Sequence, residues 1–492
     1  MDIFYFGYYR KELALYLESK LGASPEQIIL IFTIIMTIPF SFLNYFIHSK
    51  TNRLLYSFLI GFLFQYSIFG INMLHTIFST ISTYLFVYFL GRKISPFYLL
   101  IGIMIHLSYL HIYRMIVDYG GWTVDDITTI YMISVTKYSS FAFSFADGNI
   151  DQKNIKSEHH KAYRIEKTPS FLEFASYIYF YPTSIAGPFI EFKDFINFIE
   201  EKDCYNSLNN KFCFLFVEGL KKFFAGIFFI AFYAIIGARY PISPVGTSQF
   251  RIDYPIWWKR ILYLYIAGPV ARSKYYIAWL LCYSSLIFSG MAYGEIKKED
   301  KIIKNVEKGS YGSILFNEFG MHPKYKMIHW NRPIHIWLKY NVYTRLLNPL
   351  NKNIVLASFI TYIFSSIWHG FYPSYYLNFF LIYLFEQNSL FLDRFGFYKF
   401  VDENKIMWPL VSLKSTFFND SIGAFFYCLE SGAVKQIMIN FYGLPVYVTV
   451  GFFIFTVIYN IFFGEKKIKK IAQENSIDKE KVEKKIEKEK KQ

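Results

Sequence analysis

The chain has 492 residues, of which 54% are hydrophobic and 22% aromatic but only 18% charged, and its mean hydropathy is +0.24. This balance lies outside the usual range of soluble globular proteins and places the chain in a lipid bilayer. The formal net charge of +15 comes mostly from Lys and Arg in loops and in residues 465–492, where cytoplasmic loops and anionic lipid headgroups explain it better than a nucleic-acid partner.

The first predicted element is an amphipathic N-terminal segment, residues 1–27. It mixes charged with apolar positions and shows no cleavable signal peptide, so the first membrane span would itself act as the targeting signal. Residues 28–464 form one predicted membrane domain, because apolar runs of about 20 residues, long enough to cross a bilayer as a helix, recur along it. The stronger candidate spans are 28–47, 54–74, 76–90, 97–117, 212–238, 275–293, 354–368, 375–392 and 445–463.

Three weaker apolar segments are interrupted by Pro and Gly or are too short to cross. They are residues 171–190, 256–266 and 407–429, and three polar loops are expected at 147–170, 200–211 and 297–324. Irregular backbone at membrane depth is tolerated only where protein or a water-filled cavity satisfies it, so we expect re-entrant or chamber-lining segments here. The predicted fold is an all-α polytopic bundle of about 9–12 membrane helices, some re-entrant or broken, around an intramembrane catalytic chamber.

The last predicted element is a charged tail, residues 465–492, rich in Lys and Glu. It ends Lys488-Glu489-Lys490-Lys491-Gln492, with lysines third and fifth from the end. This spacing resembles the dilysine retrieval signal of endoplasmic-reticulum membrane proteins, which predicts a multi-pass protein of that membrane with a cytosolic C-terminus. A tail with 11 lysines can also produce the spacing by chance.

The most informative side chain is His369, which follows 15 residues without a charged side chain, 354–368. An ionisable group at membrane depth is costly and usually functional. Burial disfavours the charged imidazolium, so the ring stays neutral and able to accept a proton, as a general base must. The alternative is a histidine that hydrogen-bonds a neighbouring helix. Gly370 and Pro373, which allow close approach and end a helix, favour a polar pocket.

A second stretch, 329–346, precedes this span and carries Asn331 among several cations. Asn331 is an uncharged hydrogen-bond donor and acceptor. The cations Arg332, Lys339 and Arg345 have an alternative reading, a membrane-interface belt together with the neighbouring Trp and Tyr residues.

The order of these motifs resembles the membrane-bound O-acyltransferase family: a Trp-Asn element, an apolar span, Trp-His-Gly, then Pro and paired tyrosines. Further stretches resemble its lysophospholipid acyltransferase branch. They are Asp118-Tyr119-Gly120-Gly121-Trp122, Lys137 with Ala146-Asp147-Gly148, Tyr181-Pro182 with Ala186-Gly187-Pro188-Phe189, and Lys274-Tyr275-Tyr276 with Trp279. Two positions depart from the pattern. Tyr283 stands where many members carry Glu, which bears on the lysolipid preference, and Ser374 stands where Gly is common.

The resemblance implies transfer of a fatty acyl group from acyl-CoA to the free hydroxyl of a lysophospholipid. It maps the family's functional asparagine and histidine onto Asn331 and His369. The residues expected to bind substrate are Asp147, Trp368, Trp337, Arg332, Lys339, Arg345 and Lys274, and Arg272 is another candidate for the phosphates of the coenzyme.

The expected partners are acyl-CoA, a lysophospholipid and membrane lipids. We expect no cofactor besides acyl-CoA as co-substrate, and no obligate protein partner. The four cysteines have no CxxC spacing, so no disulfide framework and no metal site are expected. Alternatives are a family member acting on a sterol, a diacylglycerol or a protein, and, in a different class, a membrane transporter.

Overall fold

The computed structural model describes residues 12, 16, 25–120, 127–298, 301–404, 406–430 and 432–462, with the side chains of 25–27 and 297–298 excepted. Apart from one antiparallel hairpin, β1 (Gly294–Lys298) with β2 (Lys301–Asn305), these residues form helices and connecting turns. The predicted all-α class is confirmed. The hairpin was not expected, and it lies where a polar loop, 297–324, was predicted.

The helices of the first half are α2 (Pro25–Leu43), α3 (Lys50–Phe69), α4 (Leu74–Leu90), α5 (Pro96–Val117), α6 (Thr128–Asp147), α7 (Glu158–Tyr163), α8 (Phe171–Tyr179), α9 (Tyr181–Ser184), α10 (Phe192–Ile199) and α11 (Phe212–Phe232). Those of the second half are α12 (Gln249–Asp253), α13 (Trp257–Phe288), α14 (Ile314–Phe319), α15 (Pro323–His329), α16 (Arg332–Trp337), α17 (Thr344–Leu346), α18 (Ile354–His369), α19 (Pro373–Arg394), α20 (Phe397–Glu403), α21 (Met407–Tyr427) and α22 (Ala433–Asn440). A π-helix, Leu338–Tyr343, joins α16 to α17, and a last helix covers Leu444–Phe462.

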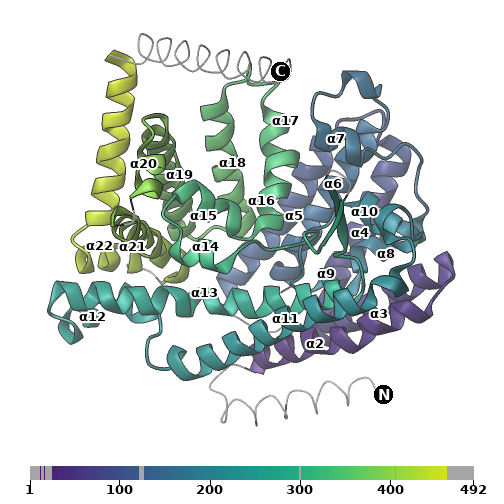
Figure 1. Cartoon of the computed structure of the whole chain (residues 1–492), viewed down its shortest axis with the longest axis horizontal. Coiled ribbons are helices and arrows are strands. Elements are labelled where there is room, and N and C mark those ends of the chain that lie inside the picture. The colour runs from purple at the N-terminus through teal and green to yellow at the C-terminus, as the bar shows by residue number, and fades with distance from the viewer. Residues whose placement is uncertain are drawn as a thin grey trace, which may run out of the picture.

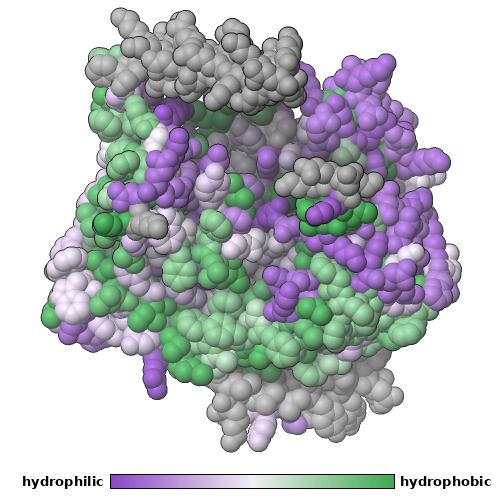
Figure 2. Space-filling model, in the orientation of Figure 1, coloured by the Kyte–Doolittle hydropathy of each residue, from purple (hydrophilic) through white to green (hydrophobic). Residues whose placement is uncertain are grey.

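Within the described residues, five helical runs are long and apolar enough to cross a membrane: Ile28–Phe46, Lys50–Leu90, Pro96–Val117, Leu208–Gly237 and Leu444–Phe462. Large hydrophobic side chains on these runs point outward. Figure 2 shows such side chains in green along the lower edge, over α11, whereas hydrophilic ones gather over the region of α7. An apolar outer surface of this extent suits lipid, so the chain is a multi-pass membrane protein.

The helices lie in two orientations. In Figure 1, α11 and α13 pack side by side across the lower part of the view, whereas α18 and the last helix, Leu444–Phe462, stand upright. The upright α18 ends at His369, and the aromatic side chains around that end come from α19 and α21. The candidate site therefore lies where the end of α18 meets α19 and α21.

The centre of the first half is α6, a helix that the apolar runs did not predict. It is buried along most of its length, but its Ser, Thr and Lys residues lower its hydropathy. The ammonium of Lys137 is satisfied by three acceptors: the carbonyl oxygens of Tyr177 (3.0 Å) and Ile178 (3.1 Å) and the hydroxyl of Thr183 (2.7 Å). A fully hydrogen-bonded cation can be buried, so this polar helix forms part of the core.

The weak segment 171–190 is broken, as the sequence predicts. Its helices α8 and α9 have nine and four residues, and nine residues rise only about 14 Å, less than half of a bilayer core. A Cβ on Gly187 would lie 2.0 Å from the carbonyl oxygen of Pro182, so only glycine allows the chain to fold back here. The central Gly-Pro motif is therefore part of the packed interior.

The predicted separation of segments 256–266 and 275–293 is wrong, because α13 runs unbroken for 32 residues with Pro269 inside it. The charges that interrupt the apolar pattern here include Arg272, which is paired with buried carboxylates. Charge compensation from other helices, which the sequence pattern does not show, lets the helix continue.

Candidate active site

His369 lies at the C-terminal end of α18, where the chain turns. Gly370 follows with φ of 127°, and its N–H donates to the carbonyl oxygens of Ser366 (3.1 Å) and Ile367 (3.2 Å). Such a backbone angle favours glycine. Pro373 then starts α19, since proline fits the first turn of a helix. The Trp-His-Gly motif thus ends one helix and turns directly into the next.

The imidazole of His369 is enclosed by aromatic rings. The ring of Phe379 stacks on it at 5.0 Å between centroids, and those of Trp368, Phe426 and Tyr375 lie at 4.7, 5.2 and 6.0 Å. Its side chain is half-buried. No hydrogen bond joins the imidazole to another of the described residues, so its nitrogens remain available to a ligand.

Asn331 precedes α16 and has a left-handed backbone, with φ of 45°. Asparagine tolerates this conformation better than most residues. Its backbone carbonyl accepts from the N–H groups of Ile334 and His335, but its side-chain Oδ1 is buried without a partner among the described residues. A buried acceptor without a donor is costly, so this oxygen is a candidate contact for substrate.

A continuous aromatic wall connects the Asn331 segment with His369. Trp330 packs on Tyr275 (5.7 Å), Tyr275 on Tyr427 (6.3 Å), Tyr427 on Phe426 (5.5 Å) and Phe426 on His369. These rings come from α13 and α21 as well as from the two motifs. The residues adjoining the two predicted catalytic positions thus share one apolar wall.

The two predicted binding tryptophans join the motifs from the other side. Trp337 and Trp368 pack at 5.7 Å and are almost fully buried. The indole N–H of Trp337 donates to the hydroxyl of Ser139 (2.9 Å), and that of Trp368 to the carbonyl of Met132 (3.1 Å). Both acceptors belong to α6, so the two indole rings hold α16 and α18 against this helix.

His111 is a site neighbour that the apolar pattern of 97–117 did not single out. This residue of α5 is buried, and its Nε2 lies 3.0 Å from the carbonyl oxygen of Trp368. Because a carbonyl only accepts, Nε2 carries the proton. A Cβ on Gly370 would lie 3.4 Å from this ring. An ionisable side chain within an apolar run is a signal that could have found it, although His106 in the same run gives the same signal.

Two of the predicted binding residues pair with each other. The guanidinium of Arg345 donates from both terminal nitrogens to the carboxylate of Asp147, with the first contact at 2.7 Å. This bidentate pair joins α6 to α17, just after the π-helix. The carboxylate that precedes Gly148 in the early motif therefore holds the segment that carries the cations.

The other predicted cations are more open. Arg332 pairs with Glu307 at 2.5 Å, and its side chain is 35% exposed. The ammonium groups of Lys339 and Lys274 lie over the rings of Tyr340 (5.0 Å) and Tyr233 (5.2 Å), and both lysines are exposed. Exposed cations beside aromatic rings can still reach an anion.

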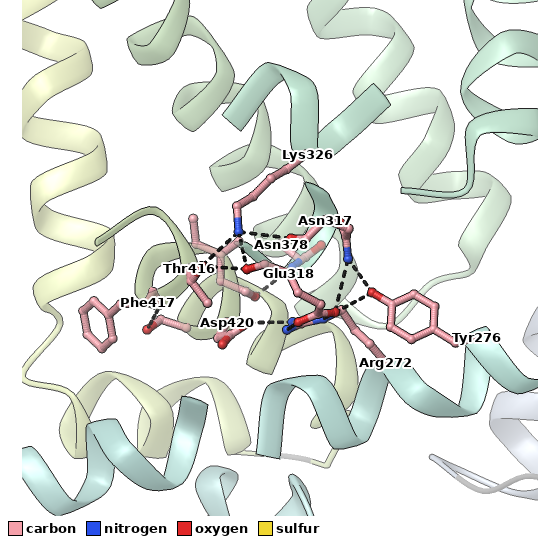
Figure 3. Close-up of polar contacts among 11 residues, drawn as sticks. Arg272, Tyr276, Asn317, Glu318, Lys326, Asn378, Thr416, Phe417 and Asp420 are labelled. Carbon is pink, nitrogen blue, oxygen red and sulfur yellow. Dashed lines mark hydrogen bonds and ion pairs between the residues drawn. The ribbon is translucent and has the colours of Figure 1, made fainter. Parts of the chain in front are cut away.

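Arg272, by contrast, is buried in an ionic cluster that Figure 3 shows between α13, α14, α15 and α21. Its Nε donates to Glu318 at 2.7 Å, and its other nitrogens reach Glu318 and Asp420. Lys326 donates at 3.0 Å to the hydroxyl of Thr416 and to the carbonyl oxygens of residues 317 and 318. Two cations balance two carboxylates here, so the guanidinium of Arg272 has no free side for a phosphate.

Two histidines of α7, His159 and His160, form a polar cap on Tyr340 of the π-helix Leu338–Tyr343. His159 stacks on Tyr340 at 3.7 Å, and Nε2 of His160 lies 2.9 Å from the carbonyl oxygen of Tyr340. Burial lowers the pKa of His159 to about 4, so the ring is neutral at pH 7 and its contact with Glu191 at 3.4 Å is not an ion pair. His159 therefore adds no positive charge near the exposed Lys339.

Among the described residues, no group of three or more His, Cys, Asp or Glu side chains lies close enough together to hold a metal ion. Tyr283, which stands where the resemblance implies a glutamate, is buried, and its hydroxyl donates to the carbonyl of Val306.

Comparison with known proteins gives a family match over most of the chain. A sequence model of the membrane-bound O-acyltransferase family matches residues 28–395. The lysophospholipid acyltransferase of Saccharomyces cerevisiae is 29% identical over 322 residues, 61% of this chain and 51% of that protein. Lysophospholipid acyltransferase 2 of Arabidopsis thaliana is 26% identical over 389 residues, 77% of this chain and 79% of that protein. Human lysophospholipid acyltransferase 5 is 24% identical over 385 residues, 76% of this chain and 75% of that protein.

Proposed function

The chain belongs to the membrane-bound O-acyltransferase family, and we propose that it transfers a fatty acyl group from acyl-CoA to the free hydroxyl of a lysophospholipid. The relatives above bear the name lysophospholipid acyltransferase, and the resemblance of the motifs to the family assigns its functional asparagine and histidine to Asn331 and His369. The proposed location is the endoplasmic-reticulum membrane, with the C-terminus in the cytosol; the tail on which this rests, 465–492, lies outside the described residues.

The observation that carries the proposal is that the imidazole of His369 has no hydrogen-bond partner among the described residues. A neutral ring without a hydrogen bond to the described residues can accept the proton of the lipid hydroxyl. The hydroxyl oxygen then attacks the thioester carbonyl, the C–S bond breaks, and the imidazolium returns its proton to the thiolate leaving group. Coenzyme A leaves as the free thiol, and no covalent acyl-enzyme is needed.

Asn331 would hold the thioester during this step. Its amide N–H₂ can donate to the carbonyl oxygen as negative charge develops there, and its buried Oδ1 needs a donor that an N–H or O–H of a substrate can supply. Removing one such donor typically slows a reaction about 100- to 1000-fold.

The phosphates of the coenzyme would meet the exposed cations Lys339, Lys274 and Arg332. Arg345 and Asp147 act on this contact indirectly, because their mutual pair holds the segment that carries Lys339. The aromatic wall between Trp330 and His369 would pack against the acyl chain.

A panel of acceptors tests the function. The purified protein is incubated with labelled oleoyl-CoA and, separately, a lysophospholipid, a sterol, a diacylglycerol and a peptide alcohol. We expect labelled diacyl phospholipid in the first reaction at a rate well above the others. A faster reaction with another alcohol would assign a different branch of the family, and no acyl transfer to any of them would favour a transporter.

A further inference from the structure

A cavity of about 100 Å³ lies between the C-terminal half of α19 and the N-terminal half of α21. These are the parts of the two helices that are far from His369. Its walls come from α15, α19, α20, α21 and the last helix, and they are mostly apolar, with Phe385, Leu392, Phe418 and Phe452 among them. Lys414 also lines it and is exposed. The cavity thus joins an apolar interior to a cation at the protein surface.

Three buried polar side chains line this cavity without satisfying one another. Oδ1 of Asn388, Oγ of Ser415 and Oγ1 of Thr449 have no hydrogen-bond partner among the described residues, and these residues are only 6%, 5% and 2% exposed. The amide nitrogen of Asn388 donates to the backbone carbonyl of Thr449 at 2.9 Å. This hydrogen bond turns Oδ1 away from that carbonyl.

A buried polar group without a hydrogen-bond partner destabilises the fold. Three around one cavity therefore point to a ligand that donates and accepts hydrogen bonds. Asn388 Oδ1 can only accept, so the ligand must offer a donor, whereas the two hydroxyl groups can do either. A hydroxyl group meets both demands.

The cavity is separate from the candidate active site. Ser415 and Phe426, which touches His369, are about 16 Å apart along α21 at 1.5 Å per residue. The ionic cluster lies between them on the same helix, through Thr416 and Asp420 (Figure 3). A ligand in this cavity would therefore sit about three helical turns from the reacting atoms.

We propose that the cavity is a second, non-catalytic site for a lipid that carries a free hydroxyl next to an acyl chain and a phosphate. The hydroxyl donates to Asn388 Oδ1 and accepts from Ser415 or Thr449, the chain follows the phenylalanine-lined wall toward the bilayer, and the phosphate pairs with Lys414. The volume is smaller than the roughly 150 Å³ of an engineered cavity that binds benzene, so it holds the hydroxyl-bearing part of the lipid and not the whole molecule. A lysophospholipid has all three groups, and naming it as this lipid rests on the proposed function.

Photolabelling tests the site without any acyl transfer. The full chain in nanodiscs, with no acyl-CoA present, is labelled by a lysophospholipid bearing a diazirine on its acyl chain, and the labelled peptides are mapped. We expect label on peptides that contain Phe385, Phe418 or Phe452, and about tenfold less label there from a diacyl analogue that lacks the hydroxyl.

The matched variant is Thr449→Val, which keeps the shape of the side chain and removes a hydroxyl without a partner. It should leave thermal stability unchanged or slightly higher, yet weaken saturable labelling at this cavity by about tenfold, the equivalent of about 1.4 kcal/mol. Ser415→Leu, which fills the cavity, should abolish labelling there while label near His369 persists.

Label confined to the surroundings of His369 would mean that the cavity holds only water and would overturn the proposal. Equal labelling by both lipids would show that the hydroxyl is not what is recognised. Because binding is read without turnover, labelling at the cavity in a protein that fails the acceptor panel would uphold the site and refute only the proposed function.

Discussion

The ionisable side chains of His369 and Arg272 have opposite kinds of surroundings. Arg272 has carboxylates on both sides, from Glu318 and Asp420, and the neighbouring Lys326 is also fully hydrogen-bonded. The imidazole of His369 packs against aromatic rings and makes no hydrogen bond to the described residues. Both regions involve α21, which contributes Phe426 to the first and Asp420 to the second.

The contrast separates charges that stabilise the structure from a group free to react. Removing one member of a buried ion pair is costly, because the other member stays buried without an opposite charge. An open imidazole contributes little to stability through hydrogen bonds, so its replacement should affect turnover much more than folding. The two regions should therefore respond oppositely to mutation.

The largest effect should follow His369→Ala. Loss of a general base lowers turnover by about 100- to 10,000-fold, while the melting temperature changes little. Acyl transfer and thermal unfolding are measured on the same purified sample. Phe379→Leu is the matched control, since it removes the stacked ring and keeps the imidazole, and it should lower turnover by less than about tenfold. Similar losses in both variants would assign His369 a packing role.

The next effect should follow Asn331→Gly, which removes the amide and keeps the left-handed backbone that glycine adopts freely. We expect turnover to fall about 100- to 1000-fold, as for loss of an oxyanion donor, with the fold retained. Asn331→Ala adds backbone strain to the same loss. If the glycine variant stays active and only the alanine variant fails, the backbone conformation and not the amide is what the site needs.

Arg272→Met should mainly destabilise the protein. It removes the ion-pair partner of two buried carboxylates and leaves Lys326 to balance both, which costs about 3–5 kcal/mol. Thermal unfolding in detergent checks this. Adding Glu318→Gln and Asp420→Asn should recover part of the loss, because the two carboxylates are then uncharged and Lys326 keeps its three neutral hydrogen-bond acceptors. A single variant as stable as the parent chain would show that the ionic cluster does not stabilise the fold.

A smaller effect is expected at Arg345 and Asp147, whose charge-assisted pair is partly exposed. Removing either side chain should cost about 1.5–3 kcal/mol, and a double-mutant cycle measures their coupling. The same variants decide whether Arg345 also binds coenzyme. If it does, Arg345→Ala raises the KM for acyl-CoA and Asp147→Ala does not, whereas a purely structural pair raises it equally in both.

The sequence predicted most of the membrane helices because a long apolar run has few other possible structures. It missed α6, since the three acceptors that allow Lys137 to be buried come from segments about 40 residues away. It separated α13 into two segments for a similar reason, because the carboxylates that neutralise Arg272 lie on α14 and α21.

For the site, the motifs pointed to His369 and Asn331, while the roles of the cations depended on tertiary contacts. Nothing in the local pattern distinguishes Arg345, which pairs with Asp147, from the exposed Lys339. The catalytic and binding roles proposed for these residues stay predictions.

A single-turnover reaction tests most directly whether His369 is the general base of acyl transfer. Parent and His369→Ala proteins, each in excess over labelled oleoyl-CoA, are mixed with saturating lysophospholipid, and thioester binding and product formation are followed separately. We expect the variant to bind the thioester as the parent does but to form product at least about 100-fold more slowly. Product formed at the parent rate by the variant would contradict this expectation.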